Sequence, residues 1–449
     1  MARQLFGTDG IRGVAGEYPL DRATARAVGA ALGAWIEETG SSHEVVIGMD
    51  TRESGSWLAA EVAAGLAPHG GQVRFAGVTT TPGIAFLARK GPFSAGVMIS
   101  ASHNPYQDNG IKILGHNGYK LPDDEEERLE TRIFEQLRQP ASAPAPELRI
   151  DAGLDHAYIE HLAATVSRDL SGLRLVVDCA NGGASHLAPK LFERLGAHVH
   201  PIGSSPNGRN INLDSGSLHL ELLQAAVLEQ KADAGVAFDG DADRALFVAP
   251  SGRLIDGDAV LLIAARDLMA QNRLNGRDGK PVVVATVMSN LGLERALSAH
   301  GIRLARTPVG DKYVLDEMLK AGAVLGGEQS GHIIFLDYAT TGDGMLTALR
   351  VFEIARKTGQ TLDQLAAEMK VYPQRLVNVR VRERKPLEDL PAVREQIRAA
   401  ETAFGETGRV LVRFSGTEPL ARVMVEGPDQ SQVDDYATRI ATQIKQDLG

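Results

Sequence analysis

Cysteine is almost absent from this sequence: Cys179 is the single cysteine among 449 residues. One thiol excludes an intrachain disulfide and a cysteine-based metal cluster. Long apolar runs are also missing: residues 1–20 lack the apolar segment of a signal peptide, and no stretch approaches a membrane span. We therefore expect a cytoplasmic protein with no membrane partner. Cys179 follows the apolar run 173–177, and we interpret it as a small buried residue.

The chain also has no excess of basic residues. It contains 47 Lys and Arg and 57 Asp and Glu, which give a formal net charge of -10. A general nucleic-acid binder needs a basic face, so this class is disfavoured, whereas a small anionic substrate needs only a local cluster of Arg and Lys. The chain also lacks a Gly-x-Ser-x-Gly elbow, which argues against a serine hydrolase.

What the chain does contain is a repeated alternation of strand-like and helix-like segments. Its length exceeds what one hydrophobic core usually supports, so several domains are expected. The alternation predicts three doubly wound α/β domains followed by a smaller C-terminal α+β domain. A proline-rich linker at 139–147 ends the first unit. We assign the domains to residues 1–150, 151–250, 251–368 and 369–449.

The chain is organised around residues 96–105, where an apolar run ends abruptly in small and polar residues. This places Ser100, Ser102 and His103 on a loop at the carboxyl end of a strand, where ligands collect in open α/β sheets. A hydroxyl beside a histidine is a candidate nucleophile or phosphate carrier. A polar turn without catalytic meaning is the alternative.

A carboxylate triplet follows the apolar run 234–238 directly. Asp239, Asp241 and Asp243 stand at alternate positions with only Gly and Ala between them, and they repel one another unless a cation gathers them. A calcium EF-hand is excluded because its sixth and twelfth positions would be Arg244 and Pro250. Oxygen ligands at a strand end suit Mg²⁺, and a solvated acidic turn is the alternative.

Weaker signals lie elsewhere in the chain. Arg12, within the glycine-rich stretch 6–13, is able to bind a phosphate with two hydrogen bonds, although a tight turn explains it equally well. Lys112 alternates with two isoleucines and so points away from the apolar face, toward solvent or a cleft. Glu328 and Ser330 face the same way in an extended loop and suit paired sugar hydroxyls, or form an ordinary surface turn.

The last unit contains a loop with two arginines around hydroxyls and a glycine. Such a loop is a composite phosphate cradle, with a solvated basic turn as the alternative. Its candidate residues are Arg413, Ser415, Gly416, Thr417 and Arg422.

Five motifs in this order resemble the α-D-phosphohexomutase family over essentially the full chain. They are F-G-T-D-G-I-R-G (6–13), S-A-S-H-N-P (100–105), D-G-D-A-D-R (239–244), G-E-Q-S-G-H (327–332) and S-G-T-E-P (415–419). The opening motif and the glutamine of the fourth motif favour the branch that interconverts glucosamine 6-phosphate and glucosamine 1-phosphate, feeding amino-sugar nucleotide and cell-wall precursor synthesis. Phosphomannomutase or phosphoglucomutase activity is the alternative, as is a non-catalytic phosphosugar-binding protein.

The resemblance implies a role for each motif. Ser102 would carry a phosphoryl group, and Asp239, Asp241 and Asp243 would hold one Mg²⁺ with a phosphoserine oxygen. A sugar bisphosphate would act as intermediate and activator. The remaining implied roles are charge neutralisation by Arg12 and Arg244, sugar binding by Glu328 and Ser330, and binding of the distal phosphate by Arg413, Ser415, Gly416, Thr417 and Arg422.

Proton transfer has two candidates. Lys112 resembles the family's general acid/base position and would shuttle a proton if burial and cationic neighbours lowered its pKa. His103 competes for the role. Two departures from the family pattern concern phosphate contacts: Met49 replaces a basic residue, so a phosphate contact there rests on Arg52 alone, and Phe414 stands inside the phosphate loop. The chain is compatible with a homodimer.

Overall fold

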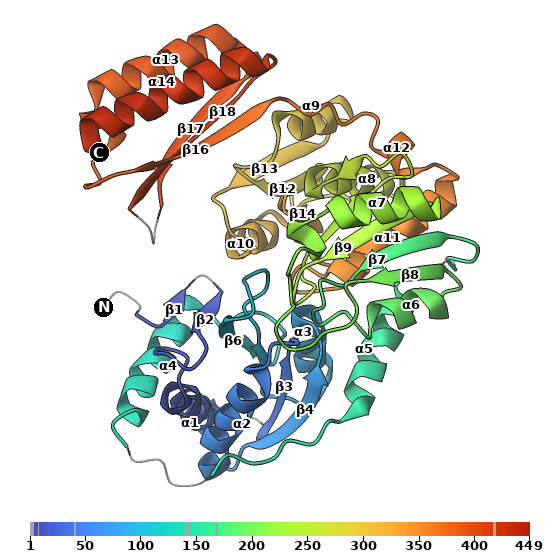
Figure 1. The fold of residues 1–449 in the computed structure, drawn as a ribbon, viewed down its shortest axis with the longest axis vertical. Coiled ribbons are helices and arrows are strands. Elements are labelled where there is room, and N and C mark those ends of the chain that lie inside the picture. Colours follow the sequence, from blue (N-terminus) through green and yellow to red (C-terminus); the bar gives the residue numbers. More distant parts are fainter. Residues whose placement is uncertain (1–3, 8, 40–41, 140–143, 168, 416–418) are drawn as a thin grey trace. The chain divides into compact units, whose positions relative to one another are not determined.

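The computed structural model describes residues 4–449 except 8, 40–41, 140–143, 168 and 416–418. Over these residues the strands form four sheets (Figure 1). By their contacts the residues group into two compact units. One unit comprises residues 1–288 and 302–367, and the other comprises 289–301 and 368–449.

The first sheet of the larger unit has six strands within the described residues, in the order β1-β2-β6-β5-β3-β4. β3 pairs in parallel with β4 and β5, while β6, β2 and β1 add antiparallel strands at one side. The strands are β1 (Phe6–Gly7), β2 (Gly10–Val14), β3 (Glu44–Met49), β4 (Gln72–Val78), β5 (Ala95–Ile99) and β6 (Asp108–Gly115). The helices are α1 (Arg22–Thr39), α2 (Gly55–Leu66), α3 (Thr81–Lys90), α4 (Asp123–Gln136) and α5 (Ala152–Ala164).

Both faces of this sheet are covered, which explains the unbroken apolar runs of its central strands. Val45 and Ile47 of β3 pack into the core formed with α1, α2 and α4, whereas Val46 packs into the core formed with α3. Because successive strand residues point to opposite faces, a strand buried on both sides must be apolar at every position.

Two further sheets complete the larger unit. The second has the order β11-β10-β9-β7-β8 and the third β13-β12-β14-β15, each combining parallel central pairs with antiparallel strands on one side. The strands are β7 (Arg174–Asp178), β8 (His198–Ile202), β9 (Ala234–Phe238), β10 (Ala245–Val248), β11 (Leu254–Ile255), β12 (Val282–Thr286), β13 (Arg303–Thr307), β14 (Leu325–Gly327) and β15 (Ile333–Phe335). The helices are α6 (Ala188–Arg194), α7 (Glu221–Gln230), α8 (Gly257–Ala270), α10 (Asp311–Ala321), α11 (Gly344–Thr358) and α12 (Leu362–Leu365).

The smaller unit holds an antiparallel sheet with the order β16-β18-β17. Helices α13 and α14 lie side by side on it and share its apolar core (Figure 1). Its elements are α9 (Leu291–Ala299), β16 (Gln374–Arg380), α13 (Pro391–Phe404), β17 (Arg409–Phe414), β18 (Leu420–Glu426) and α14 (Gln430–Leu448). Three mixed α/β sheets and a smaller antiparallel α+β unit confirm the predicted fold class, while the four domain boundaries stay predictions.

Cys179 is buried, as predicted. Within the described part of the chain, every helix is too short or too polar to cross a bilayer.

Candidate active site

The serine loop follows β5, and Ser102 sits in it with a strained backbone. Its φ of 51° lies in the left-handed region, which costs an L-residue roughly 1–2 kcal/mol. The side chain is buried, and its Oγ donates a hydrogen bond of 2.6 Å to Asp239 Oδ2. His103 Nδ1 lies 3.4 Å from the same Oγ. The loop therefore holds the predicted nucleophile against the predicted metal ligands, although the two come from different sheets.

The three carboxylates of the loop after β9 are gathered as the sequence predicts. Ligand atoms of Asp239, Asp241 and Asp243 all lie within 4.8 Å of one another, and all three residues are buried. Burial and the charges of Asp243 and Asp241 raise the pKa of Asp239 well above its usual range. Three adjacent carboxylates are therefore not all ionised unless a cation joins them.

Two oxygens of this cluster are open to such a cation. Oδ1 of Asp241 and Oδ1 of Asp243 are buried and have no hydrogen-bond partner in the described structure. An uncompensated buried carboxylate oxygen is costly, and binding a divalent cation would remove that cost. The donor set thus fits a metal ion held by carboxylate oxygens.

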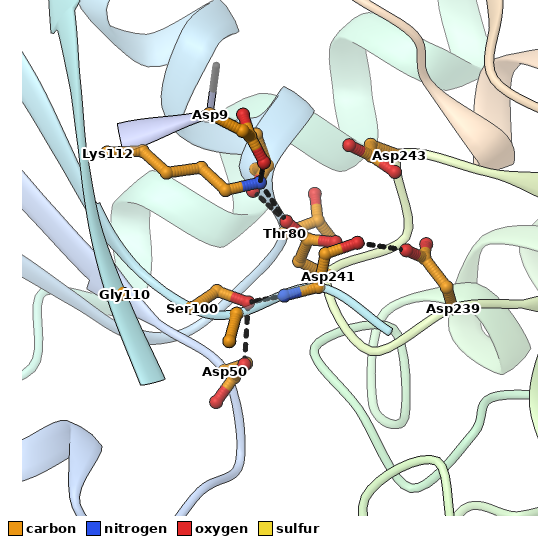
Figure 2. Close-up of polar contacts among 12 residues, drawn as sticks. Asp9, Asp50, Thr80, Ser100, Gly110, Lys112, Asp239, Asp241 and Asp243 are labelled. Atoms are coloured by element: carbon orange, nitrogen blue, oxygen red, sulfur yellow. Dashed lines mark hydrogen bonds and ion pairs between the residues drawn. The ribbon is translucent and has the colours of Figure 1, made fainter. Parts of the chain in front are cut away.

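Lys112, on β6, points into the site and not into solvent (Figure 2). Its Nζ lies 2.8 Å from Asp241 Oδ2 and 2.9 Å from Asp9 Oδ2, and the side chain is 2 % exposed. Burial alone would lower the pKa of Lys112, but the Asp241 and Asp9 carboxylates raise it above its usual range. The condition under which Lys112 was expected to shuttle a proton, a pKa lowered by cationic neighbours, is not met with these partners.

Asp9 also lies at the centre of a series of ion pairs that the sequence did not predict. Its Oδ1 is 2.7 Å from Lys120 Nζ, and Lys120 is 2.6 Å from Asp311 at the start of α10. Lys120 therefore links the carboxylate of Asp9, which contacts Lys112, to the carboxylate of Asp311. The only sequence signal for Asp9 was its place inside the glycine-rich opening motif.

Arg12 and Arg244 flank the serine loop. Arg12 Nη1 donates to the Ala101 carbonyl at 3.3 Å, and its Nη2 pairs with Asp9. The Nε of Arg12 and the Nε of Arg244 are buried without a hydrogen-bond partner in the described structure. Burial and these two arginines lower the pKa of His103 to about 4, so this imidazole is neutral at pH 7. Two guanidinium groups whose Nε–H groups make no hydrogen bond suit an anionic ligand.

The loop after β14 carries the predicted sugar ligands. Glu328 Oε1 accepts a hydrogen bond of 3.2 Å from the Gly310 backbone N–H, and both Glu328 and Ser330 are partly exposed. His332 at the end of the same motif was not predicted as a site residue. It is buried, its Nδ1 lies 3.5 Å from Asp243 Oδ2, and its Nε2 accepts a hydrogen bond from the Gly342 N–H.

The predicted phosphate loop belongs to the smaller unit. Arg413 of β17 and Arg422 of β18 are direct cross-strand partners, so their side chains leave the sheet on the same face. Burial and the charge of Arg422 lower the pKa of Arg413. Ser415 is buried at the end of β17. Gly416 and Thr417 lie outside the described residues.

Comparison with known proteins agrees with this architecture. Four domain profiles of the phosphoglucomutase/phosphomannomutase family match in order: α/β/α domain I at residues 3–139, domain II at 156–252, domain III at 256–372 and the C-terminal domain at 376–443.

The chain is 60% identical over 450 residues to the phosphoglucosamine mutase of Solibacter usitatus and 50% identical over 461 residues to that of Koribacter versatilis, covering 100% of this chain and 100% and 98% of the relatives. Among solved structures it resembles a phosphoglucomutase/phosphomannomutase family protein from Burkholderia thailandensis, with a TM-score of 0.80, 25% identity, and coverage of 98% of this chain and 97% of the other. The chain therefore belongs to the phosphoglucomutase/phosphomannomutase family of isomerases, the α-D-phosphohexomutases.

Proposed function

We propose that this enzyme interconverts glucosamine 6-phosphate and glucosamine 1-phosphate through a phosphoserine at Ser102 and a sugar bisphosphate intermediate. The observation that supports it best is the hydrogen bond of 2.6 Å from Ser102 Oγ to Asp239, inside a buried carboxylate triplet. The closely related chains that bear the name phosphoglucosamine mutase supply the choice of sugar.

The carboxylates and the serine define where the metal would be held. Asp239, Asp241 and Asp243, with an oxygen of phosphorylated Ser102, would bind one Mg²⁺. When bound, Mg²⁺ neutralises charge on the transferring phosphoryl group. Arg12 and Arg244 add positive charge beside the same loop. Their Nε–H groups make no hydrogen bond in the described structure and are available to phosphate oxygens, although Arg244 Nε also lies 3.9 Å from Asp243 Oδ1.

The reaction is a pair of phosphoryl transfers in opposite directions. A sugar hydroxyl attacks the phosphorus of phosphoserine, the bond from phosphorus to Ser102 Oγ breaks, and a base accepts the hydroxyl proton. The bisphosphate then reorients and returns its other phosphoryl group to Ser102, which releases the isomeric monophosphate. Ser102 therefore ends each cycle phosphorylated, and a bisphosphate sugar is the activator that loads it.

His103 and Lys112 differ in the proton states that their surroundings favour. His103, with its pKa lowered to about 4, is neutral at pH 7 and able to accept a proton. Lys112 is held charged by Asp9 and Asp241, and its raised pKa means that it keeps its proton. We infer that His103 serves as the proton shuttle in the transfer from phosphoserine, and that Lys112 supplies positive charge beside the transferring group.

Substrate binding divides between two loops. Glu328 and Ser330 would bind ring hydroxyls, and the paired arginines Arg413 and Arg422 would bind the phosphate that is not being transferred. Ser415, Gly416 and Thr417 complete the second loop in the proposal. A cytoplasmic location and a homodimer stay predictions.

Sugar choice is tested by assaying the enzyme on the 6-phosphates of glucosamine, glucose and mannose in parallel. Each assay uses fully phosphorylated enzyme and the matching bisphosphate activator. We expect kcat/KM for glucosamine 6-phosphate to exceed the other two by at least about tenfold, roughly 1.4 kcal/mol of transition-state preference. Equal or reversed ratios would leave the mutase chemistry in place and favour a phosphomannomutase or phosphoglucomutase.

A non-catalytic phosphosugar-binding protein is the second alternative. It would bind glucosamine 6-phosphate without turnover and without phosphate on Ser102. Intact-protein mass spectrometry after incubation with glucosamine 1,6-bisphosphate separates it from the mutase, which should gain one phosphoryl group on Ser102.

A further inference from the structure

Arg52, in the loop after β3, is a buried cation whose neighbours are backbone carbonyls of the serine loop. Its side chain is fully buried and forms an ion pair of 2.9 Å with Asp50. Nη2 donates at 2.9 Å to the carbonyls of Ser102 and Asn104. Nη1 donates to the carbonyls of Pro105 and, at 2.9 Å, Asp108.

These contacts use every donor that the guanidinium group has. Arginine carries five side-chain N–H groups, one on Nε and two on each Nη. Nε donates to Asp50, and the other four donate to the four carbonyls. Arg52 therefore has no N–H group left for a phosphate, and the sequence-based idea of a phosphate contact at this position is not supported.

The peptide groups on both sides of Ser102 are held. On the carbonyl side, Asn212 Nδ2 donates to the Ser102 oxygen at 2.9 Å, beside the Arg52 bond. On the amide side, the Ser102 N–H donates at 2.9 Å to Ser100 Oγ, which donates at 2.6 Å to Asp50 (Figure 2). Asp50 is thus bound to Arg52 and to Ser100, so one buried pair fixes both ends of the residue.

The hydrogen bonds to the amide and the carbonyl of Ser102 are able to hold its backbone in an otherwise unfavourable conformation. Its φ of 51° is disfavoured for serine and persists only where the surroundings over-determine it. Relaxation to a negative φ would rotate the Cα–Cβ bond and move Oγ away from Asp239. The same direction must be kept through two successive transfers, since Ser102 first gives and then receives a phosphoryl group.

We propose that Arg52 is a positioning residue for phosphoryl transfer, which with Asp50, Ser100 and Asn212 fixes the left-handed backbone that aims Ser102 Oγ at the carboxylate triplet. The inference rests on the proposed function only in taking Ser102 as the phosphoryl carrier. It assigns Arg52 an effect on kcat and not on substrate binding.

The test is Arg52→Lys, which keeps the charge opposite Asp50 but removes the fork that reaches four carbonyls. We expect kcat to fall by about a hundredfold while KM for glucosamine 6-phosphate changes by less than about twofold. Loading of Ser102 by glucosamine 1,6-bisphosphate, followed by mass spectrometry, should slow in parallel. Amides of residues 100–108 should exchange hydrogen faster in the variant than in the parent.

A matched control is Arg350→Lys on α11, because Arg350 is also buried, is paired with Glu353 at 2.5 Å and donates to a backbone carbonyl. This variant should lose stability but keep kcat and the rate of Ser102 loading. A loss of activity equal to that of Arg52→Lys would mean that destabilisation alone explains the effect, and the proposal would be wrong.

Asn212→Ala keeps the proposal testable if Arg52→Lys does not fold. It removes one donor to the Ser102 carbonyl without disturbing the ion pair, and we expect about a tenfold lower kcat with unchanged KM. A raised KM with parental kcat in either variant, or parental values throughout, would overturn the assignment. Failure of the proposed function would be seen separately, as parent enzyme that acquires no phosphate on Ser102.

Discussion

Gly240 stands between two of the proposed metal ligands, and replacing it with alanine should damage catalysis more than folding. A Cβ at this position would lie 2.4 Å from the Ser102 carbonyl oxygen, against 3.4 Å for ordinary contact, a shortfall of 1.0 Å. The side-chain nitrogen of Asn212 would be 2.9 Å away. The Ser102 carbonyl and the Asn212 side chain are both held by hydrogen bonds. The serine loop and the loop that carries the carboxylate triplet must therefore move apart by about 1 Å.

The size of the effect follows from that separation. A misplacement of about 1 Å at a reacting group can cost roughly a hundredfold in rate. Overpacking of a well-filled region costs about 1–3 kcal/mol of stability, which a folded enzyme of this size is expected to survive. We therefore expect Gly240→Ala to remain folded with kcat reduced about a hundredfold.

The assay measures turnover of glucosamine 6-phosphate, Ser102 loading by mass spectrometry, and thermal unfolding by circular dichroism. Gly153→Ala is the control, because a Cβ there meets only the Asp151 side-chain oxygen at 3.1 Å, at the start of a helix. It should keep the parental rate. Parental activity in Gly240→Ala would refute the reasoning that the contact between the two loops sets the geometry of transfer.

Three further predictions concern single side chains. Ser102→Ala should abolish turnover and leave unfolding unchanged; activity sustained by phosphate on Ser100 would contradict the assignment. Asp241→Asn should slow Ser102 loading at least about a hundredfold and weaken the Mg²⁺ requirement, since one charge leaves the ligand set; a metal titration matching the parent's would exclude the triplet as the metal site. Burial raises the pKa of Asp343 to about 6 from 3.8. Between these two pKa values the native state binds more protons than the unfolded state. The free energy of unfolding, relative to that of Asp343→Asn, should therefore fall by about 2 kcal/mol as pH rises from 4 to 6. Urea unfolding of both proteins across that range checks the sign, and a flat difference would contradict it.

The sequence alone determined which segments become strands and which loops carry the chemistry. The run Ala234–Phe238 is the strand β9 as predicted, and the carboxylate triplet follows it directly. Short-range patterns predict these strands and loops because an unbroken apolar run must be buried, and because polar and glycine residues end the run. Helix Ala152–Ala164 was not predicted, although its buried residues Leu154, Tyr158 and Leu162 lie four positions apart, as on one face of a helix.

Only the tertiary structure decided what surrounds each side chain. Strand alternation left Lys112 facing either solvent or a cleft, and its partners Asp9 and Asp241 lie 103 and 129 residues away in the chain. Those carboxylates raise its pKa, whereas the sequence-based hypothesis required cationic neighbours that would lower it.

Arg52 shows the same limit. Its position in the loop after β3 was evident, but the four carbonyls that bind it lie 50 to 56 residues further on. No local pattern specifies which carbonyls a guanidinium group will meet, because that depends on how strands and loops distant in sequence pack together. Tertiary packing therefore determines the pKa of a buried group and the strained backbone of Ser102. It also determines whether a residue such as Arg52 contacts substrate or positions another residue.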